Sequence, residues 1–249
     1  MSAGDDTMRA VWEESFAEAI ARSAYNTAPV EALIRNVAYY LRDRHPDGDY
    51  SGLRFLEMGC GAGPNLLWLA EKGIRVSGVD ISPTALDLAR GLLAESGHSE
   101  LSEEFIEASV SDVPLPDESF DGILESCVFQ HLPREDRDRA FAEVGRLLKP
   151  GGLFVGNMLG DNHTIYRGKQ GEDLEDDPGT LILEDGSSKI HLSDIGLSHF
   201  FSKDEYDGLL GGFSTVDPCP SEYELPREEA SRRGYDSYLQ SMWTVYAIK

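Results

Sequence analysis

The stretch that decides the fold is Leu53–Asp80, LRFLEMGCGAGPNLLWLAEKGIRVSGVD. In order, it predicts a buried strand (53–56), a turn with glycine at 59, 61 and 63, a helix (65–72) and a second strand (74–79). Pro64 suits the first turn of that helix, and Gly73 suits its end. Elements in this order are typical of one half of a doubly wound parallel sheet, in which ligands bind beyond the carboxyl ends of the strands.

Asp80 stands at the end of the second strand, about 20 residues after the glycine turn, where an acid can accept hydrogen bonds from ribose hydroxyls. A nicotinamide dehydrogenase would use the same arrangement, but its G-x-G-x-x-G pattern fails here. Counted from Gly59, its last glycine is replaced by Pro64, and counted from Gly61 it is replaced by Leu66. Glu57 precedes the first glycine, and an acid there can meet an ammonium group through water or a backbone amide. The turn therefore favours a nucleoside that carries a charged amino-acid tail.

The motifs EMGCGAG (57–63) and VDIS (79–82) resemble the first motif pair of class I S-adenosylmethionine-dependent methyltransferases. The resemblance extends from Leu53 to Leu159, because DESFD (117–121) and LKPGG (148–152) match the same family in order and spacing. It implies an α/β fold with a doubly wound, mostly parallel, seven-stranded sheet. It also implies an N-terminal helical lid and a C-terminal antiparallel strand pair.

The resemblance implies S-adenosylmethionine as the cofactor and S-adenosylhomocysteine as its product. It places cofactor contacts at Tyr25, Glu57, Gly59, Cys60, Gly61, Gly63, Asn65, Asp80, Ile81, Ser82, Ser109, Val110, Glu125 and Ser126. Adenine recognition departs from the family pattern, because Ser109 stands where family members commonly carry an acid. Three candidates for the adenine contact stay open: Ser109, a shifted Asp112 and the backbone amide of Val110.

We expect residues 1–249 to form a single domain in three parts. Residues 1–50 are expected to form the helical cap, with helices over 8–23 and from Pro29, and with Tyr25 in the break between them. Residues 51–159 form the cofactor-binding core. Residues 160–249 supply a long polar loop (160–195), either a lid or disordered, and two last strands at 213–216 and 242–248.

The composition limits the partners. Acidic residues number 45 against 22 lysines and arginines, so the net charge is −23. Nucleic acids and anionic membranes need cationic contacts, and both are therefore disfavoured. The three cysteines are widely spaced, and we see neither a signal peptide nor a membrane-spanning stretch, so we expect a reducing, cytoplasmic location. Monomer and homodimer are both open.

Methyl transfer depends mainly on orientation, so a catalytic residue is not obligatory. If the acceptor needs a general base, histidine is suited to neutral pH. His131 is the first candidate, because its loop follows the fourth expected strand at the cofactor face. His163 and His191 in the polar loop come next. The spacing of the His, Cys and acidic residues matches no metal-binding pattern, and we predict no metal.

The sequence therefore predicts a methyltransferase that acts on an oxygen or nitrogen of a small molecule. Three alternatives stay open. A protein methyltransferase would need an acidic docking groove for a basic peptide. A catalytically inactive nucleoside-binding scaffold subunit is opposed by the intact glycine turn and by Asp80, and a dehydrogenase is opposed by Pro64 and Leu66.

Overall fold

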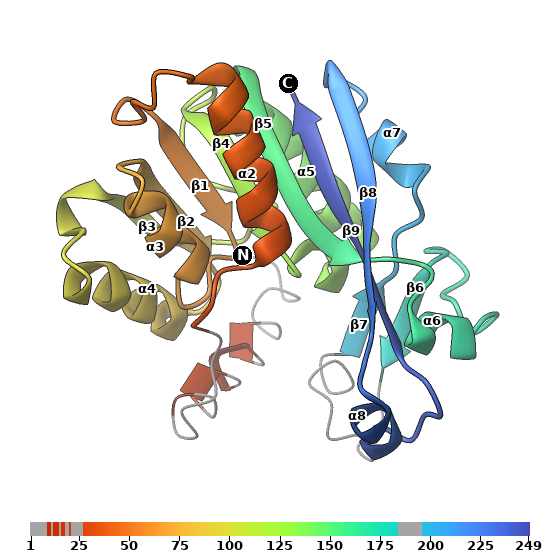
Figure 1. Cartoon of the computed structure of the whole chain (residues 1–249). Helices are drawn as coiled ribbons and strands as arrows, with labels where there is room; N and C mark the ends of the chain where they lie inside the picture. The colour runs from red at the N-terminus through yellow and green to blue at the C-terminus, as the bar shows by residue number, and fades with distance from the viewer. Residues whose placement is uncertain (1–8, 11, 15, 18–19, 21–26, 184–195) are drawn as a thin grey trace.

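The structure of the protein is a computed structural model that describes residues 9–10, 12–14, 16–17, 20, 27–183 and 196–249. Its centre is a seven-stranded sheet with the strand order β3-β2-β1-β4-β5-β9-β8 (Figure 1). The strands are β1 (Arg54–Met58), β2 (Arg75–Asp80), β3 (Ser102–Glu107), β4 (Phe120–Ser126), β5 (Leu148–Leu159), β8 (Thr215–Glu224) and β9 (Leu239–Ile248). Strands β1 to β5 are parallel, and β9 runs antiparallel between β5 and β8. The predicted sheet is confirmed.

Helices cover both faces of this sheet, which explains why its central strands are almost continuously apolar. On one face lie α2 (Glu31–Arg44), α3 (Pro64–Ala70) and α4 (Pro83–Glu95). Their buried side chains, such as Leu33, Leu66 and Leu86, share one apolar cluster with Phe55 of β1. On the other face lie α5 (Arg134–Leu147) and α7 (Glu205–Leu209) (Figure 1). Two covered faces make the sheet a rigid platform for groups at its carboxyl edge.

The C-terminal strand pair is longer than the sequence indicates. We expected strands at 213–216 and 242–248, but β8 continues to Glu224, and β9 begins at Leu239. The extension of β8 contains Pro218 and Pro220, although proline has no N–H to donate to a strand ladder. Strand β8 tolerates both because it is the outermost strand of the sheet.

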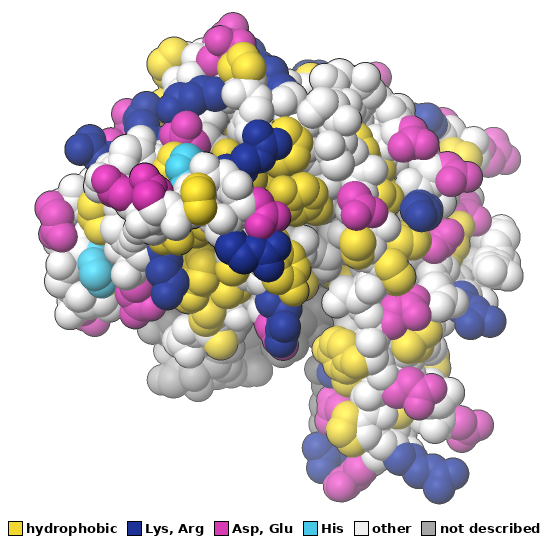
Figure 2. Space-filling view, turned by 45° about the horizontal axis from the view of Figure 1, so that its top comes forward, with side chains coloured by type: hydrophobic (Ala, Val, Ile, Leu, Met, Phe, Trp, Pro, Cys, Tyr) yellow, Lys and Arg dark blue, Asp and Glu magenta, His cyan; other side chains and the backbone are white. Residues whose placement is uncertain are grey.

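The long arms of β8 and β9 carry a lobe that projects beyond the sheet (Figures 1 and 2). It contains α6 (Thr164–Gly168), β6 (Thr180–Leu183), β7 (Gly196–His199) and α8 (Arg227–Arg232). Strands β6 and β7 pair antiparallel, and the lobe has its own apolar cluster around Phe200 and Tyr238. Much of the polar loop expected at 160–195 is thus folded, while 184–195 lies outside the described residues.

At the N-terminus, the described residues between Arg9 and Ile20 are helical, as expected. The next helix, α2, begins at Glu31 with Val30 as its cap, two residues later than predicted from Pro29. On the surface seen in Figure 2, acidic side chains are spread widely, with lysines and arginines interspersed. Among the described residues, no helix is long and apolar enough to cross a membrane.

Candidate cofactor and acceptor site

The glycine turn joins β1 to α3 at the carboxyl edge of the sheet. The backbone N–H groups of Gly59 and Cys60 donate to Val79 O at 2.7 and 3.1 Å, which ties the turn to β2. Gly59 has φ +76°, and a Cβ there would lie 2.2 Å from Val128 Cγ2. The close approach of Val128 and the positive φ thus both require glycine at 59.

Asp80 ends β2 beside this turn. Its Oδ2 accepts from Gly61 N at 2.8 Å, and its Oδ1 accepts from Ser82 N at 2.9 Å. Burial raises the pKa of Asp80, and these backbone hydrogen bonds oppose that shift. The carboxylate is therefore held in one orientation at the place where a ribose is expected.

A cavity of about 610 Å³ lies over the carboxyl ends of β1, β2, β3 and β4. Eight residues predicted from the sequence line it: Gly59, Gly61, Asp80, Ile81, Ser109, Val110, Ser126 and His131. Of the three candidates for adenine, Ser109 and Val110 reach the cavity, and Asp112 is not part of its wall. The volume is typical of a small-molecule site.

Six other predicted residues lie behind the wall: Glu57, Cys60, Gly63, Asn65, Ser82 and Glu125. Glu57 Oε1 accepts from Asn65 Nδ2 at 2.6 Å, and Asn65 Oδ1 accepts from Val30 N at 2.8 Å. Burial raises the pKa of Glu57 to about 8. Its Oε2 is buried without a hydrogen-bond partner among the described groups. These contacts connect the glycine turn to the start of α2.

Glu125 organises the loop after β4. Its carboxylate accepts from the backbone N–H groups of Val128, Phe129 and Asn157 at 2.6, 3.2 and 3.3 Å. Burial raises the pKa of Glu125 to about 7, in opposition to those three hydrogen bonds. Glu125 therefore shapes the loop that carries Cys127 and Val128, rather than the cavity itself.

His131 lines the cavity, but both of its ring nitrogens are engaged. Gln130 Oε1 accepts from Leu159 N at 2.7 Å, so Gln130 Nε2 is the donor that faces His131 Nε2 at 3.1 Å. Nδ1 donates to Leu197 O at 3.1 Å. Burial lowers the pKa of His131 to about 4. The expected general base thus has no free lone pair, and His131 instead joins the loop after β4 to β7.

The expectation that His163 is catalytic is wrong. Its side chain is fully buried, and Nδ1 accepts from Ile165 N at 3.2 Å, which caps α6. The ring packs against Phe200 and Tyr238 at centroid distances of 5.5 and 5.4 Å, inside the projecting lobe. The other two residues singled out from the sequence, Tyr25 and His191, lie outside the described residues.

Residues 56–156 match the family model described as "Methyltransferase domain". The malonyl-[acyl-carrier protein] O-methyltransferase of Serratia marcescens is 29% identical over 64% of this chain and 57% of that enzyme. A SAM-dependent methyltransferase of Methanosarcina mazei superposes with a TM-score of 0.61 at 25% identity, over 81% of this chain and 95% of the other. Residues 56–156 are a methyltransferase domain, and the chain has the fold of the S-adenosylmethionine-dependent methyltransferases.

The fold also matches a Burkholderia thailandensis N1-methyltransferase, solved with 1,6-didemethyltoxoflavin and S-adenosylhomocysteine bound. That structure gives a TM-score of 0.58 at 19% identity, over 100% of this chain and 91% of the other. The chain spans about half the length of the curated relatives that it matches. S-Adenosylmethionine is the cofactor of the family.

Several residues of the methyltransferase cavity were missed by the sequence reasoning. They are Trp12, Phe16, Ala108, Cys127, Val128, Leu132, Pro133, Asp136 and Leu197. Trp12 and Phe16 come from the N-terminal helix, and Leu197 comes from β7. Periodicity alone cannot tell what Phe16 contacts, and the direction in which the helix lies brings its ring to Gly61.

Two residues of the N-terminal helix, Glu13 and Arg9, fix it to the methyltransferase core through polar contacts. Glu13 accepts from Ser82 Oγ at 2.6 Å and also from Thr84 Oγ1, at the start of α4. Arg9 forms an ion pair with Glu107 at the end of β3. The helix therefore covers the cavity from the side of β2 and β3, as the family resemblance implied for a lid.

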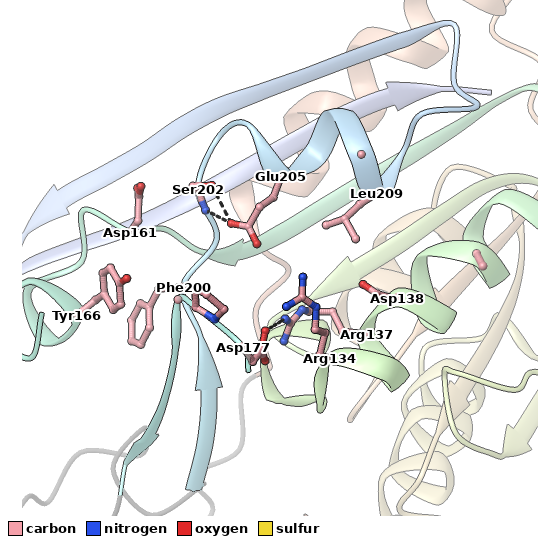
Figure 3. Close-up of a pocket in the computed structure, with 14 residues that line it drawn as sticks. Arg134, Arg137, Asp138, Asp161, Tyr166, Asp177, Phe200, Ser202, Glu205 and Leu209 are labelled. Atoms are coloured by element: carbon pink, nitrogen blue, oxygen red, sulfur yellow. Dashed lines mark hydrogen bonds and ion pairs between the residues drawn. The ribbon is translucent and has the colours of Figure 1, made fainter. Parts of the chain in front are cut away.

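A second cavity of about 780 Å³ lies between α5 and the segments around β6 and α7, and it shares no lining residue with the first (Figure 3). Arg137 and Asp177 form a buried ion pair there at 2.6 Å. Asp177 Oδ2 accepts from Thr180 Oγ1 at 2.6 Å, and His199 joins Thr180 to Glu205 at 2.8 and 2.9 Å. These paired groups join the projecting lobe to α5, so we interpret them as structural.

Among the described residues, no cluster of His, Cys, Asp or Glu has the arrangement of a metal site. The three cysteines are free: Cys60 is buried, Cys127 is half-buried beside the cavity and Cys219 is exposed. Burial raises the pKa of Cys127 to about 12, with the Glu125 carboxylate adding to the shift. Cys127 therefore lines the cavity as a neutral thiol.

Proposed function

We propose that the protein transfers the methyl group of S-adenosylmethionine to an oxygen or nitrogen of a small-molecule acceptor. The observation that carries the proposal is the position of the Asp80 carboxylate. It is held by two backbone amides at the wall of a cavity that the glycine turn and the loop after β4 also line. A nucleoside with an amino-acid tail fits such a site, with its ribose at the acid and its tail at the turn.

In this proposal each part of the wall has its own role. Asp80 accepts hydrogen bonds from the ribose hydroxyls. Ser109 and the backbone at Val110 face adenine. The open backbone at Gly59 and Gly61 lets the tail approach the turn. Glu57 lies behind that turn, and a nearby ammonium group of the tail would favour its ionised form, because a cation lowers the pKa of a neighbouring carboxyl.

When bound, the cofactor supplies a methyl group activated by a sulfonium. The protein then has to orient the acceptor and exclude water, which contributes roughly 7–11 kcal/mol in favourable cases. Trp12 and Phe16 cover the cavity on one side, and Leu197 closes it on another. His131 acts as a positioning residue, because its hydrogen bond to Leu197 O holds β7 against the cavity.

The relatives act on different atoms, since one is named an O-methyltransferase and a structural neighbour an N1-methyltransferase. These names do not transfer an acceptor atom to this protein, for which we propose an oxygen or a nitrogen. A cavity of about 610 Å³ that also holds the cofactor leaves room for a small acceptor or for the reacting end of a longer one.

Calorimetric titration with S-adenosylmethionine, S-adenosylhomocysteine and NADH tests the proposal. We expect the first two to bind and NADH not to bind. Asp80→Asn should weaken S-adenosylhomocysteine binding by about 10- to 100-fold, because it removes a charge-assisted hydrogen bond. Asp87→Asn on the exposed side of α4 is the matched control and should bind normally. Tight NADH binding, or equal affinity of the Asp80 variant, would overturn the assignment.

A further inference from the structure

Part of the cavity wall gathers around the ring of His131, where Trp12 lies 5.9 Å away between ring centroids and Leu197 O accepts from Nδ1, and we call this part the acceptor end. Its walls include Trp12, Leu132, Pro133 and Leu197, all of them apolar or aromatic. These residues come from the N-terminal helix, the loop after β4 and β7. A wall of this kind binds the apolar body of a ligand and leaves few places where a polar group could be satisfied.

Most polar groups at the acceptor end already have partners. The ring of His131 faces Gln130 and Leu197 O, as described above. Leu197 O accepts from His131, and the side chain of Glu125 lies behind the loop. A ligand would have to break these hydrogen bonds to use them. The polar group that can recognise a ligand must therefore come from elsewhere in the wall.

Asp136 is that group. It lies in the first turn of α5 and lines the cavity, and its side chain is 17% exposed. Oδ1 accepts a hydrogen bond from Arg139 Nη2 and forms an ion pair with that side chain, which is 57% exposed. Oδ2 has no hydrogen-bond partner among the described residues.

Charge at the acceptor end has one sign. Among the described lining residues, the charged side chains are Asp80 and Asp136, and none is a lysine or an arginine. Asp80 is engaged by Gly61 and Ser82 on the cofactor side. Asp136 is paired through one oxygen with the exposed Arg139, in an ion pair that solvent screens, and its second oxygen stays available to a cation beside the apolar walls.

We propose that the acceptor is a largely apolar molecule with one amine, and that Asp136 is the residue that selects it. This inference rests on the proposed function and names the substrate class of the same site. The amine binds as an ammonium ion against Asp136. It must release one proton to water before its nitrogen can accept a methyl group, and the partly exposed carboxylate connects it to solvent. An alcohol of the same shape binds more weakly. A carboxylate is repelled by Asp136, and moving it out of water is costly.

The test uses protein saturated with S-adenosylhomocysteine and three probes that share one body: 2-phenylethylamine, 2-phenylethanol and 3-phenylpropionate. Calorimetry should show the amine binding at least about tenfold more tightly than the acid, equivalent to about 1.4 kcal/mol. The alcohol should bind with intermediate affinity. Asp136→Asn should abolish the preference for the amine and leave the affinity for S-adenosylhomocysteine unchanged.

Asp138→Asn is the matched control, because Asp138 lies on the same helix but lines the second cavity, and its substitution removes the same charge. It should keep the preference. The inference is overturned if the acid binds as well as the amine, if the preference survives in Asp136→Asn, or if none of the probes binds to the loaded protein. Failure of S-adenosylhomocysteine to bind in the first titration would instead refute the proposed function, and this inference with it.

Discussion

Replacing Glu57 by glutamine should change how the stability of the protein depends on pH. The Glu57 carboxyl is fully buried, and burial raises its pKa from the ordinary 4.5 to about 8. One oxygen accepts from Asn65, and the other is buried without a partner. Glutamine has the same shape, keeps an acceptor for Asn65 and never ionises. Glu57→Gln is therefore a close mimic of the protonated side chain.

The size of the effect follows from linkage between protonation and folding. The folded protein holds the Glu57 proton more tightly than the unfolded chain does, so wild-type stability falls as the pH rises from about 4.5 to about 8. Each pH unit within that window removes about 1.4 kcal/mol. Between pH 5 and pH 7, wild type should lose about 3 kcal/mol that Glu57→Gln does not lose.

Urea denaturation of the ligand-free protein at pH 5, 6, 7 and 8 measures this difference. Glu57→Gln should gain on wild type steadily over the series, while the other titrating groups affect both proteins alike. Glu95→Gln, at the exposed end of α4, is the control and should follow wild type. Parallel stability curves for wild type and Glu57→Gln would refute the reasoning, because they would mean that Glu57 titrates equally in the folded and unfolded chains.

Two further predictions concern the projecting lobe. Arg137→Met leaves Asp177 buried without its ion partner and should lower the unfolding free energy by about 3–5 kcal/mol in urea denaturation. The double variant Arg137→Met/Asp177→Asn should recover part of that loss. Equal losses in the single and double variants would contradict a paired role. His163→Ala removes the cap of α6 and should lower stability by about 1–2 kcal/mol, whereas His163→Asn, which can cap a helix, should lose less. Neither substitution at His163 should change the affinity for S-adenosylhomocysteine, and a tenfold change would place His163 at the site after all.

Much of the cofactor side could be predicted because its signals are local. The glycine turn, the start of α3 at Pro64 and the acid at the end of β2 lie within one strand–helix–strand unit. Within such a unit, the chain between the residues is short and its conformation is limited by glycine, proline and hydrogen-bonded turns. Residue type and spacing are then sufficient to place Asp80 beside Gly61.

The histidines show where local signals end. His131 was expected to be a base because its loop follows β4, and that loop does line the cavity. The Nε2 lone pair of His131 accepts from Gln130, and Leu159 N orients that amide. The other ring nitrogen, Nδ1, donates to Leu197 O in a strand 66 residues away in the chain. His163 has the same residue type and a similar polar setting in the sequence, yet it is a helix cap. Protonation and access depend on partners that sequence spacing does not reveal.

The sequence by itself determined the parallel core, the order of its motifs and the resemblance to methyltransferases, because glycine conformations, strand patterning and helix ends are set by neighbouring residues. Only the tertiary structure decided which side chains close the cavity: Trp12 from the N-terminal helix, Asp136 from α5 and Leu197 from β7. These residues are far apart in the chain, and they meet because separate elements bury their apolar faces on one sheet and in one lobe. Burial is non-directional and depends on the whole packing arrangement, so the acceptor end has no local signature.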